Sequence, residues 1–295
     1  MTRLKALPAG VLAILGSVFA MALADAIIKA SAGGMTLWQI WVLRSALVLP
    51  VLYLMARGRV GLASAAWVAL RSLALVGMYL SMYPALPLID MALAGAAFYT
   101  APLFIVALSA LILGNRVTAR HWLAILTGFA GLLAIVRPFG AAFTPLVLMP
   151  VAAAAFYAVS AILTRAKCAT VAPVVLGFWL NLAFLGFGLA ALTLLSLGPD
   201  LPWDYPFLTG AWVPVTAEVW AVMATLALLM LGIAIGVAKA YQSPRPEVVA
   251  SFDYAYMIFA VFWGFIFFGE VPDIWTLVGT VLITSGGLLV LTARE

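Results

Sequence analysis

The stretch FYTAPLFIVALSALILGNRVTARHWLAILTGFAGLLAI (98–135) reappears later in the chain as DYAYMIFAVFWGFIFFGEVPDIWTLVGTVLITSGGLLV (253–290). Each copy contains two apolar runs separated by a short polar segment, a pattern typical of two consecutive membrane helices. At an offset of 155 residues the matched positions are Tyr99 with Tyr254, Gly114 with Gly269, Gly131 with Gly286 and Leu133 with Leu288. The chain is therefore predicted to consist of two related halves.

An offset near 136 extends the repeat towards the start of each half, matching Lys29 with Arg165 and Arg44 with Asn181. The two offsets differ because the Pro-rich segment 198–216 has no counterpart in the first half. The predicted halves are 1–140 and 141–295, within one integral membrane domain. Because each half has five predicted spans, an odd number, the halves enter the membrane in opposite directions. Inverted repeats of this kind are typical of transporters, with the substrate site near the midplane.

Composition indicates that most of the surface faces lipid. Apolar residues make up 67% of the 295 residues and charged residues only 8%, and the mean hydropathy is +1.21. Soluble domains contain roughly 25% charged residues. Ten segments have the ~20 apolar residues that a spanning helix needs: 8–31, 36–56, 64–88, 92–113, 121–137, 145–165, 172–197, 217–241, 247–268 and 273–292. The predicted fold is an all-α membrane protein, with ten transmembrane helices in two inverted five-helix repeats around a central cavity.

The distribution of charge between loops predicts the orientation. Alternate loops contain basic residues: Arg3 and Lys5, Arg57 and Arg59, Arg116 and Arg120, Arg165 and Lys167, Arg245, and Arg294. The other loops are acidic, with Arg137 as their one base. Basic loops stay in the cytoplasm, so we expect both termini to be cytoplasmic in a multi-pass protein of the inner (plasma) membrane. The net charge of +5 then reflects loops facing anionic lipid, and we expect no nucleic-acid partner.

The chain resembles the drug/metabolite transporter superfamily, and within it the ten-helix EamA-type exporters, which include aromatic amino acid exporters. The resemblance covers essentially the whole chain and depends on four motifs: Ala26 to Lys29, Leu43 with Arg44, the proline-to-glycine block from Pro102 to Gly114, and FFGE at Phe267–Glu270. The sequence departs from the family pattern at Asn115, Met257 and Asp253. The resemblance implies the ten-helix fold and the export of small metabolites, amino acids among them.

Three charged residues lie within the first two predicted spans. Lys29 is in the last turn of its helix, where a cation stabilises the carbonyl end by about 0.3–1 kcal/mol, so we expect a structural role. Asp25 and Arg44 lie about 10–12 Å inside the same membrane face at 1.5 Å per residue. A short loop joins their helices, and an unpaired charge there costs at least about 2.5–3.5 kcal/mol. We therefore predict an Asp25–Arg44 salt bridge, either architectural or in direct contact with substrate.

A second charged group lies nearer the cytoplasmic ends of the helices. Asp253 is about six residues inside the ninth predicted span, and its candidate partners are Lys239 and Arg71. We predict an ion pair that closes the inner gate or lies at the membrane interface, where long side chains reach water easily.

Aromatic and methionine side chains are predicted to line the pathway. The third span reads LVGMYLSMYPALPLI, in which Met78 and Met82, and Tyr79 and Tyr83, are four residues apart just before two prolines. Prolines free backbone carbonyls, which membranes tolerate only where protein or a cavity satisfies them. The predicted pathway residues are Tyr79, Met82, Tyr83, Tyr99, Trp41, Arg44, Asp25, Phe178, Trp179, Asn181 and Tyr254, with Tyr256 also marking the ninth span. Such a lining suits an apolar or aromatic solute with one or two polar anchors.

No pattern for catalysis, metal binding or a cofactor is present. The chain lacks a phosphate-binding GxxxxGK[ST] loop, and its one histidine, His121, lies in a predicted loop. We therefore expect a secondary transporter and not an enzyme, acting as a monomer or homodimer by alternating access. Its expected substrates are amino acids with aromatic or hydrophobic side chains and related amphipathic compounds. Threonine-like amino acids, nucleobases and lipid translocation remain alternatives, and both uniport and proton coupling through an aspartate remain open.

Overall fold

A computed structural model describes residues 9–61, 65–113, 119–137, 144–198, 204–242, 249, 252 and 255–292. Within these ranges the regular structure is entirely helical. The helices are α1 (Ala9–Ser31), α2 (Leu37–Met55), α3 (Ala65–Met82), α4 (Met91–Phe98), α5 (Ala101–Leu113), α6 (Ala119–Val136), the 3₁₀ turn η1 (Pro145–Val147), α7 (Leu148–Lys167), α8 (Pro173–Ser196), α9 (Pro206–Thr209), α10 (Ala217–Tyr241), α12 (Ala255–Phe268) and α13 (Ile274–Thr292). Among the described residues, seven helical segments are long and apolar enough to cross a membrane.

The predicted spans agree with most of the described helices, with differences in the third span, in the fourth span and in the Pro-rich segment. The third span was predicted to reach residue 88, but α3 ends at Met82. Pro84 and Pro87 follow, and proline has no N–H to continue a helix. The Pro-rich segment that was predicted as a long loop contains the short helix α9.

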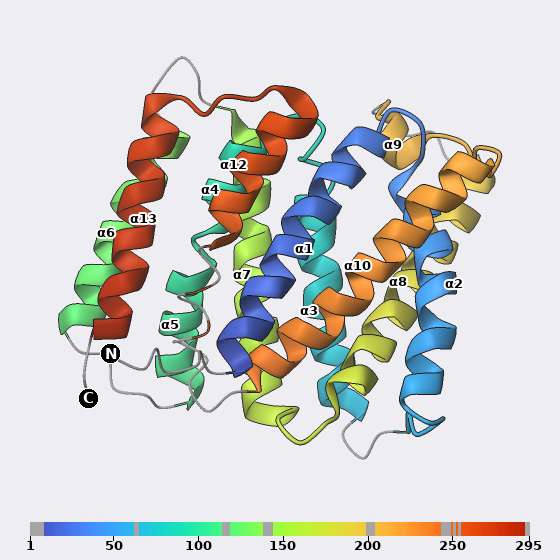
Figure 1. Ribbon diagram of the computed structural model, residues 1–295, viewed down its shortest axis with the longest axis horizontal. Coiled ribbons are helices and arrows are strands. Elements are labelled where there is room, and N and C mark those ends of the chain that lie inside the picture. Colours follow the sequence, from blue (N-terminus) through green and yellow to red (C-terminus); the bar gives the residue numbers. More distant parts are fainter. Residues whose placement is uncertain are drawn as a thin grey trace, which may run out of the picture.

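The helices pack as a flattened bundle, in which α6 and α13 form one end and α2 and α8 the other (Figure 1). Between these ends, α1 packs against α10 and α12, while α7 packs against α3 and α5. Similarly, α10 packs against α2, and α3 packs against α8. By order along the chain, α1, α2 and α3 of the first half correspond to α7, α8 and α10 of the second, and α4 with α5 corresponds to α12. Under this correspondence the α1–α10 contact becomes the α7–α3 contact, and the α10–α2 contact becomes the α3–α8 contact. The packing pattern therefore has the form expected for two related halves.

One membrane segment is interrupted in its middle. Helix α4 ends at Phe98 and α5 begins at Ala101, just before Pro102. The interruption leaves carbonyl groups without helical partners, and the Thr100 hydroxyl donates a 2.9 Å hydrogen bond to one of them, the Ala97 carbonyl. Discontinuous helices are tolerated at membrane depth where they are buried in protein or line a cavity. The interruption places Phe98 and Tyr99 in the interior of the bundle, where both are buried.

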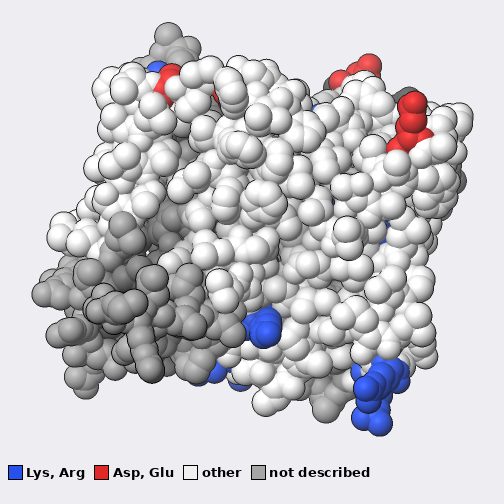
Figure 2. All heavy atoms as spheres, viewed as in Figure 1, with Lys and Arg blue, Asp and Glu red and all other residues white. Residues whose placement is uncertain are grey.

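Charge is segregated between the two ends of the helices. Figure 2 shows most acidic side chains at the upper edge and most Lys and Arg side chains at the lower edge, with a broad uncharged band between them. Large apolar side chains of the described residues are exposed, including Leu54 (74%) and Leu111 (81%). A water-facing surface would not tolerate so much exposed apolar area. We refer below to the acidic end and the basic end of the bundle.

Candidate functional site

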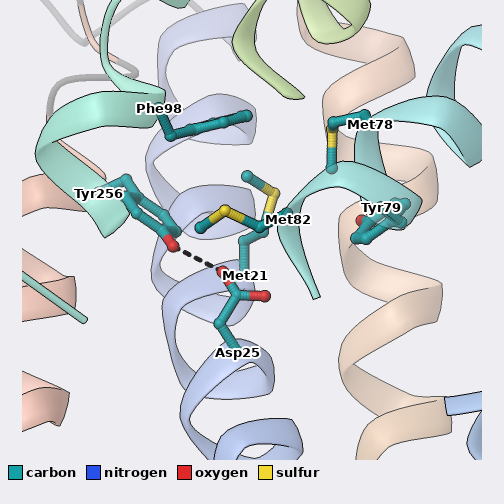
Figure 3. Close-up of a pocket in the computed structure, with 7 residues that line it drawn as sticks. All are labelled: Met21, Asp25, Met78, Tyr79, Met82, Phe98 and Tyr256. Carbon is teal, nitrogen blue, oxygen red and sulfur yellow. Dashed lines mark hydrogen bonds between the residues drawn. The ribbon is translucent and has the colours of Figure 1, made fainter. Parts of the chain in front are cut away.

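The centre of the bundle contains a buried carboxylate. Asp25 on α1 is 3% exposed, and its Oδ2 accepts a 2.6 Å hydrogen bond from the Tyr256 hydroxyl of α12. Figure 3 shows this bond reaching across from one helix to the other beside the methionines that flank it. Tyr256 is itself buried, so the carboxylate and the hydroxyl satisfy each other in an environment with little water.

A small cavity opens next to this pair. Its volume is about 10 Å³, room for about one water molecule. Its lining comes from four different helices and consists of Met21, Asp25, Met78, Tyr79, Met82, Phe98 and Tyr256. Apart from Asp25 and two tyrosine hydroxyls, this lining is apolar. Small-molecule sites usually occupy about 300–1,000 Å³, so a solute would require the surrounding helices to move apart.

A second cavity lies on the other side of a shared wall. Met21, Met78 and Tyr79 border both cavities, and the second one has a volume of about 20 Å³. Its other lining residues are Arg71, Leu75, Tyr157, Leu180, Ile233, Ala234 and Val237. The two cavities together follow the face of α3 from its last residue, Met82, to Arg71 in its second turn.

The predicted Asp25–Arg44 salt bridge is wrong. Among the described residues the ion pairs are Lys29 with Glu270 and Arg137 with Asp273. The prediction assumed that helices joined by a short loop pack face to face. Instead α1 packs mainly against α10 and α12, whereas α2 packs against α8 and α10.

Arg44 lies between α2 and α8 and is only 1% exposed. Its guanidinium carbon is 5.0 Å from the centre of the Phe184 ring, and it is hydrogen-bonded to the Tyr83 hydroxyl. The Trp41 ring packs against the same phenylalanine at 4.8 Å. Within the described part of the chain, Nε and Nη2 of Arg44 and Nε1 of Trp41 have no hydrogen-bond partner. These N–H groups are thus available to an acceptor that reaches the α2–α8 interface.

The predicted aromatic lining is present along α3 and α4. The rings of Tyr79 and Tyr83 are 4.8 Å apart, and Tyr79 also packs against Phe184 at 5.2 Å. Tyr99 packs against Tyr256 at 5.5 Å. The structure therefore brings Asp25, Met82 and Tyr79 to the first cavity and places Tyr83, Tyr99, Trp41 and Arg44 in the layer behind it.

Three residues predicted from α8 do not line either cavity. The Trp179 indole donates a 2.9 Å hydrogen bond to the Val60 carbonyl beyond the end of α2, and Phe178 packs against Tyr53, which is 47% exposed. Phe178 and Trp179 therefore face neither of these two cavities, because their depth along α8 gave no information on which face they occupy. Their place in the transport pathway stays a prediction. Asn181 is fully buried but donates to the Gly177 carbonyl of its own helix, leaving its Oδ1 without a described partner.

The predicted gate residues are only partly described. Asp253 and Tyr254 lie outside the described residues. Lys239 is exposed near the end of α10. Arg71 is buried and donates a 2.7 Å hydrogen bond from Nε to the Thr164 hydroxyl of α7, a partner that the sequence did not indicate.

Lys29 has a structural role, but between helices and not as a cap of its own helix. Its Nζ is 2.5 Å from Oε1 of Glu270 and donates a 2.8 Å hydrogen bond to the Ile89 carbonyl. Oε2 of Glu270 accepts a 2.8 Å hydrogen bond from the Met91 N–H at the start of α4. Gly269 makes this arrangement possible because its φ of +67° turns the chain directly after α12. The ends of α1, α4 and α12 are thereby linked at the acidic end.

Two further features secure the acidic end. Arg137, after α6, pairs with Asp273, before α13, and hydrogen bonds from Thr276 together with Arg137 hold the pKa of Asp273 below its usual value. The segment containing α9 folds over α2 and the turn after α3. Its contacts there are Tyr205 to the Pro84 carbonyl at 2.8 Å, Trp38 to the Leu208 carbonyl at 2.7 Å, and Gln39 to the Val213 backbone at 2.8 and 3.1 Å.

Several important residues were missed or undervalued. Phe184 and Met21 belong to long apolar runs with no polar neighbour that would single them out. The sequence motifs singled out both Glu270 and Lys29, but their contact was not predicted because 241 residues of sequence separate them. Within the described part of the chain no cluster of three His, Cys, Asp or Glu side chains has the arrangement of a metal site.

The family comparison identifies the first half of the chain directly. Residues 8–137 match the EamA-like transporter family. The pseudopaline exporter CntI of Pseudomonas aeruginosa is 28% identical over 285 residues, which cover 95% of each protein. Together these similarities support an EamA-type transporter. With the seven described helices that are long and apolar enough to cross a membrane, they support a multi-pass membrane protein that transports a small molecule.

Two riboflavin transporters are similar to this chain over shorter stretches. The Vibrio cholerae protein is 32% identical over 184 residues, 60% of this chain and 54% of that protein. The Rhizobium johnstonii protein is 29% identical over 202 residues, 66% of this chain and 60% of that protein. A solved crystal structure with 21% sequence identity superposes with a TM-score of 0.65 over 95% of this chain and 94% of its own, which shows a shared fold.

Proposed function

We propose that this transporter exports small amphipathic metabolites, and amino acids with aromatic or hydrophobic side chains in particular, by alternating access. The observation that supports this proposal most strongly is the lining of the first cavity. Three aromatic rings and three methionines surround one carboxylate there. Rings and flexible thioethers fit an apolar side chain, while a single charged group fixes a polar head.

The polar head of such a solute has two candidate anchors. Asp25 lines the cavity and would accept hydrogen bonds from an ammonium group. Arg44 lies behind Tyr83 with Nε and Nη2 unpartnered, the two N–H groups that point the same way and receive a carboxylate side-on. Because the two charges do not meet each other, a zwitterion would satisfy both.

The proposed architecture has ten spans in two inverted halves, 1–140 and 141–295, with both termini in the cytoplasm. The exchange symmetry of the packing pairs supports the two halves, and the segregation of charge between the ends supports the orientation (Figure 2). In this orientation the acidic end faces outward. The Lys29–Glu270 contact and the docked α9 segment would then close the outer side.

The proposed cycle begins with a solute that enters from the basic end and reaches Asp25 between α1, α3 and α12. Release requires the ends of α1, α4 and α12 to separate, which breaks the Lys29–Glu270 contact. We propose a facilitated uniport by a monomer or homodimer without enzymatic activity, nucleic-acid binding or a cofactor, in the inner membrane. Proton coupling through Asp25 is the alternative, because its hydrogen bond with Tyr256 would change on protonation.

The experiment that tests this function is counterflow into proteoliposomes containing the purified chain. Labelled phenylalanine, tryptophan, threonine, uracil and riboflavin are compared with and without a pH gradient. We expect phenylalanine and tryptophan to exchange without the gradient. Movement of threonine, uracil or riboflavin alone would refute the aromatic amino acid proposal. Selective movement of lipid head groups would refute the solute-transport proposal altogether, and accumulation that follows the gradient would refute the uniport.

A further inference from the structure

The second cavity contains an unusual combination of charge and apolar surface. Arg71 is only 2% exposed, and the rest of the lining consists of aliphatic, methionine and tyrosine side chains. Its Nε donates to the Thr164 hydroxyl, which in turn donates a 2.7 Å hydrogen bond to the Ser160 carbonyl. The hydroxyl proton is therefore already used, so Thr164 can only accept from the guanidinium. This fixes the position of Arg71 without neutralising its charge.

The guanidinium also has an unused donor. Nη1 of Arg71 is buried and has no partner among the described residues. A buried charge without a compensating group is costly, and natural proteins retain such a group mainly where an ion or ligand completes it. The buried charged side chains of the described residues are Asp25, Arg44 and Arg71, which leaves an excess of one positive charge. Asp25 does not offset Arg71, since it lines the other cavity and is bonded to Tyr256.

Arg71 lies between the basic end and the first cavity. It is six residues after Ala65, the first residue of α3, which corresponds to about 9 Å at 1.5 Å per residue. Tyr79, which borders both cavities, is eight residues further along the same helix, or about 12 Å. A solute moving from the basic end towards the centre of the bundle would therefore meet Arg71 before it meets Asp25.

We propose that this cavity is a carboxylate-binding station, in which Arg71 pairs with the carboxylate of an amphipathic solute before the solute reaches the first cavity. The apolar part of the solute would lie against Leu75, Leu180 and Ile233. A carboxylate fits better than a phosphate, because one guanidinium with a single unpartnered nitrogen in an apolar lining satisfies a monoanion and leaves a dianion largely unsolvated. This inference rests on the proposed transport function for its place in the cycle.

The test measures binding by the detergent-solubilised full chain, so it does not depend on transport. The probes are 3-phenylpropionate and its neutral amide, 3-phenylpropionamide, and the readout is the shift in thermal unfolding temperature as each probe is titrated. We expect the acid to stabilise the wild-type chain and the amide to do so at least about 10-fold more weakly, as expected for loss of a hydrogen bond between charged groups.

Variants then locate the binding. Arg71→Met should lower the apparent affinity for the acid by about 10-fold or more and leave that for the amide within about twofold. Arg71→Lys keeps the charge and should retain part of the preference. Ser72→Ala is the matched control, because Ser72 is the next residue of α3, is also buried, and has a hydroxyl without a described partner. We expect it to bind the acid as the wild type does.

Three results would overturn the proposal. The first is equal stabilisation by acid and amide, and the second is an acid affinity that Arg71→Met leaves unchanged in a folded protein. The third is a rise of about 10-fold or more in acid affinity on Asp253→Asn, which would mean that Asp253 already occupies the guanidinium. A chain that binds the acid through Arg71 but moves no solute in proteoliposomes would contradict the proposed function and not this site. A chain that transports solutes but binds the acid and the amide equally would contradict this site and not the proposed function.

Discussion

Replacing Tyr256 by phenylalanine should destabilise the protein through Asp25. The substitution removes one hydroxyl and leaves the buried carboxylate without the 2.6 Å hydrogen bond that it receives in the structure. A hydrogen bond to a charged group contributes about 1.5–3 kcal/mol, and a buried acceptor left unsatisfied bears that cost in full. Both side chains are at most 3% exposed, so water cannot replace the lost donor without a rearrangement of the helices. We therefore expect the free energy of unfolding to fall by about 1.5–3 kcal/mol.

A double-mutant cycle with Asp25→Asn measures this bond specifically. The free energies of unfolding of Tyr256→Phe, Asp25→Asn and the double variant are determined in mixed detergent micelles. We expect a coupling energy of about 1 kcal/mol or more, because residues in direct contact depart from additivity. The control is Tyr79→Phe, which removes a hydroxyl at the same cavity that makes no hydrogen bond within the described part of the chain.

A double-mutant cycle of Asp25→Asn with Arg44→Gln distinguishes the contacts seen in this structure from the salt bridge that the sequence predicted. Arg44 and Asp25 make no ion pair, so we expect their coupling to be smaller than that between Asp25 and Tyr256. Strict additivity for Tyr256 together with strong coupling for Arg44 would refute the reasoning. It would show that the buried carboxylate depends on the guanidinium and not on the phenol.

Three further predictions concern the packing and the acidic end. Gly131→Ala should lower stability by about 1–3 kcal/mol, because an added Cβ would lie 2.7–2.9 Å from atoms of α13, whereas Gly16→Ala, with no atom within 4 Å, should be neutral or slightly stabilising by thermal unfolding. Glu270→Gln should weaken the contact with Lys29 and so open the acidic end. A cysteine introduced into the first cavity should then react faster with a thiol reagent applied from the acidic end. An unchanged rate would exclude a closing role for the Lys29–Glu270 contact. The lowered pKa of Asp273 means that its contribution to stability is present above pH 3.8 and is lost as the pH falls through the lower folded value, so the stability difference between wild type and Asp273→Asn should vanish in acid and persist at neutral pH.

The sequence predicted the helical segments well because of a simple physical requirement. A backbone in lipid must satisfy its own hydrogen bonds, so an apolar run of about 20 residues has few alternatives to a helix. The interruption between α4 and α5 was not predicted, because the apolar run 92–113 reads as one continuous helix. The end of α3 was missed because the apolar run continues past Pro84 although the helix cannot.

The site was predicted less completely because depth along a helix does not determine which neighbour a side chain meets. Asp25 and Arg44 are at similar depth, but their helices make little contact with each other, and α10 packs against both. Trp179 was expected in the pathway, yet α8 is apolar on every side and its sequence does not reveal its inner face. The α3 residues Tyr79 and Met82, which prolines and paired aromatic residues marked in the sequence, do line the first cavity, and their role in transport stays a prediction.

The central claim, that this chain moves amphipathic amino acids through the cavity beside Asp25, is tested most directly by counterflow of labelled phenylalanine. Proteoliposomes containing the wild-type chain are compared with those containing a Phe98→Ala variant, which enlarges the cavity and removes one of its three rings. We expect wild-type vesicles to exchange phenylalanine well above empty vesicles, and the variant to lose affinity for phenylalanine by about 10-fold while it folds normally. An absence of phenylalanine exchange by the folded wild-type chain, or exchange that is unaffected by Phe98→Ala, would contradict the claim.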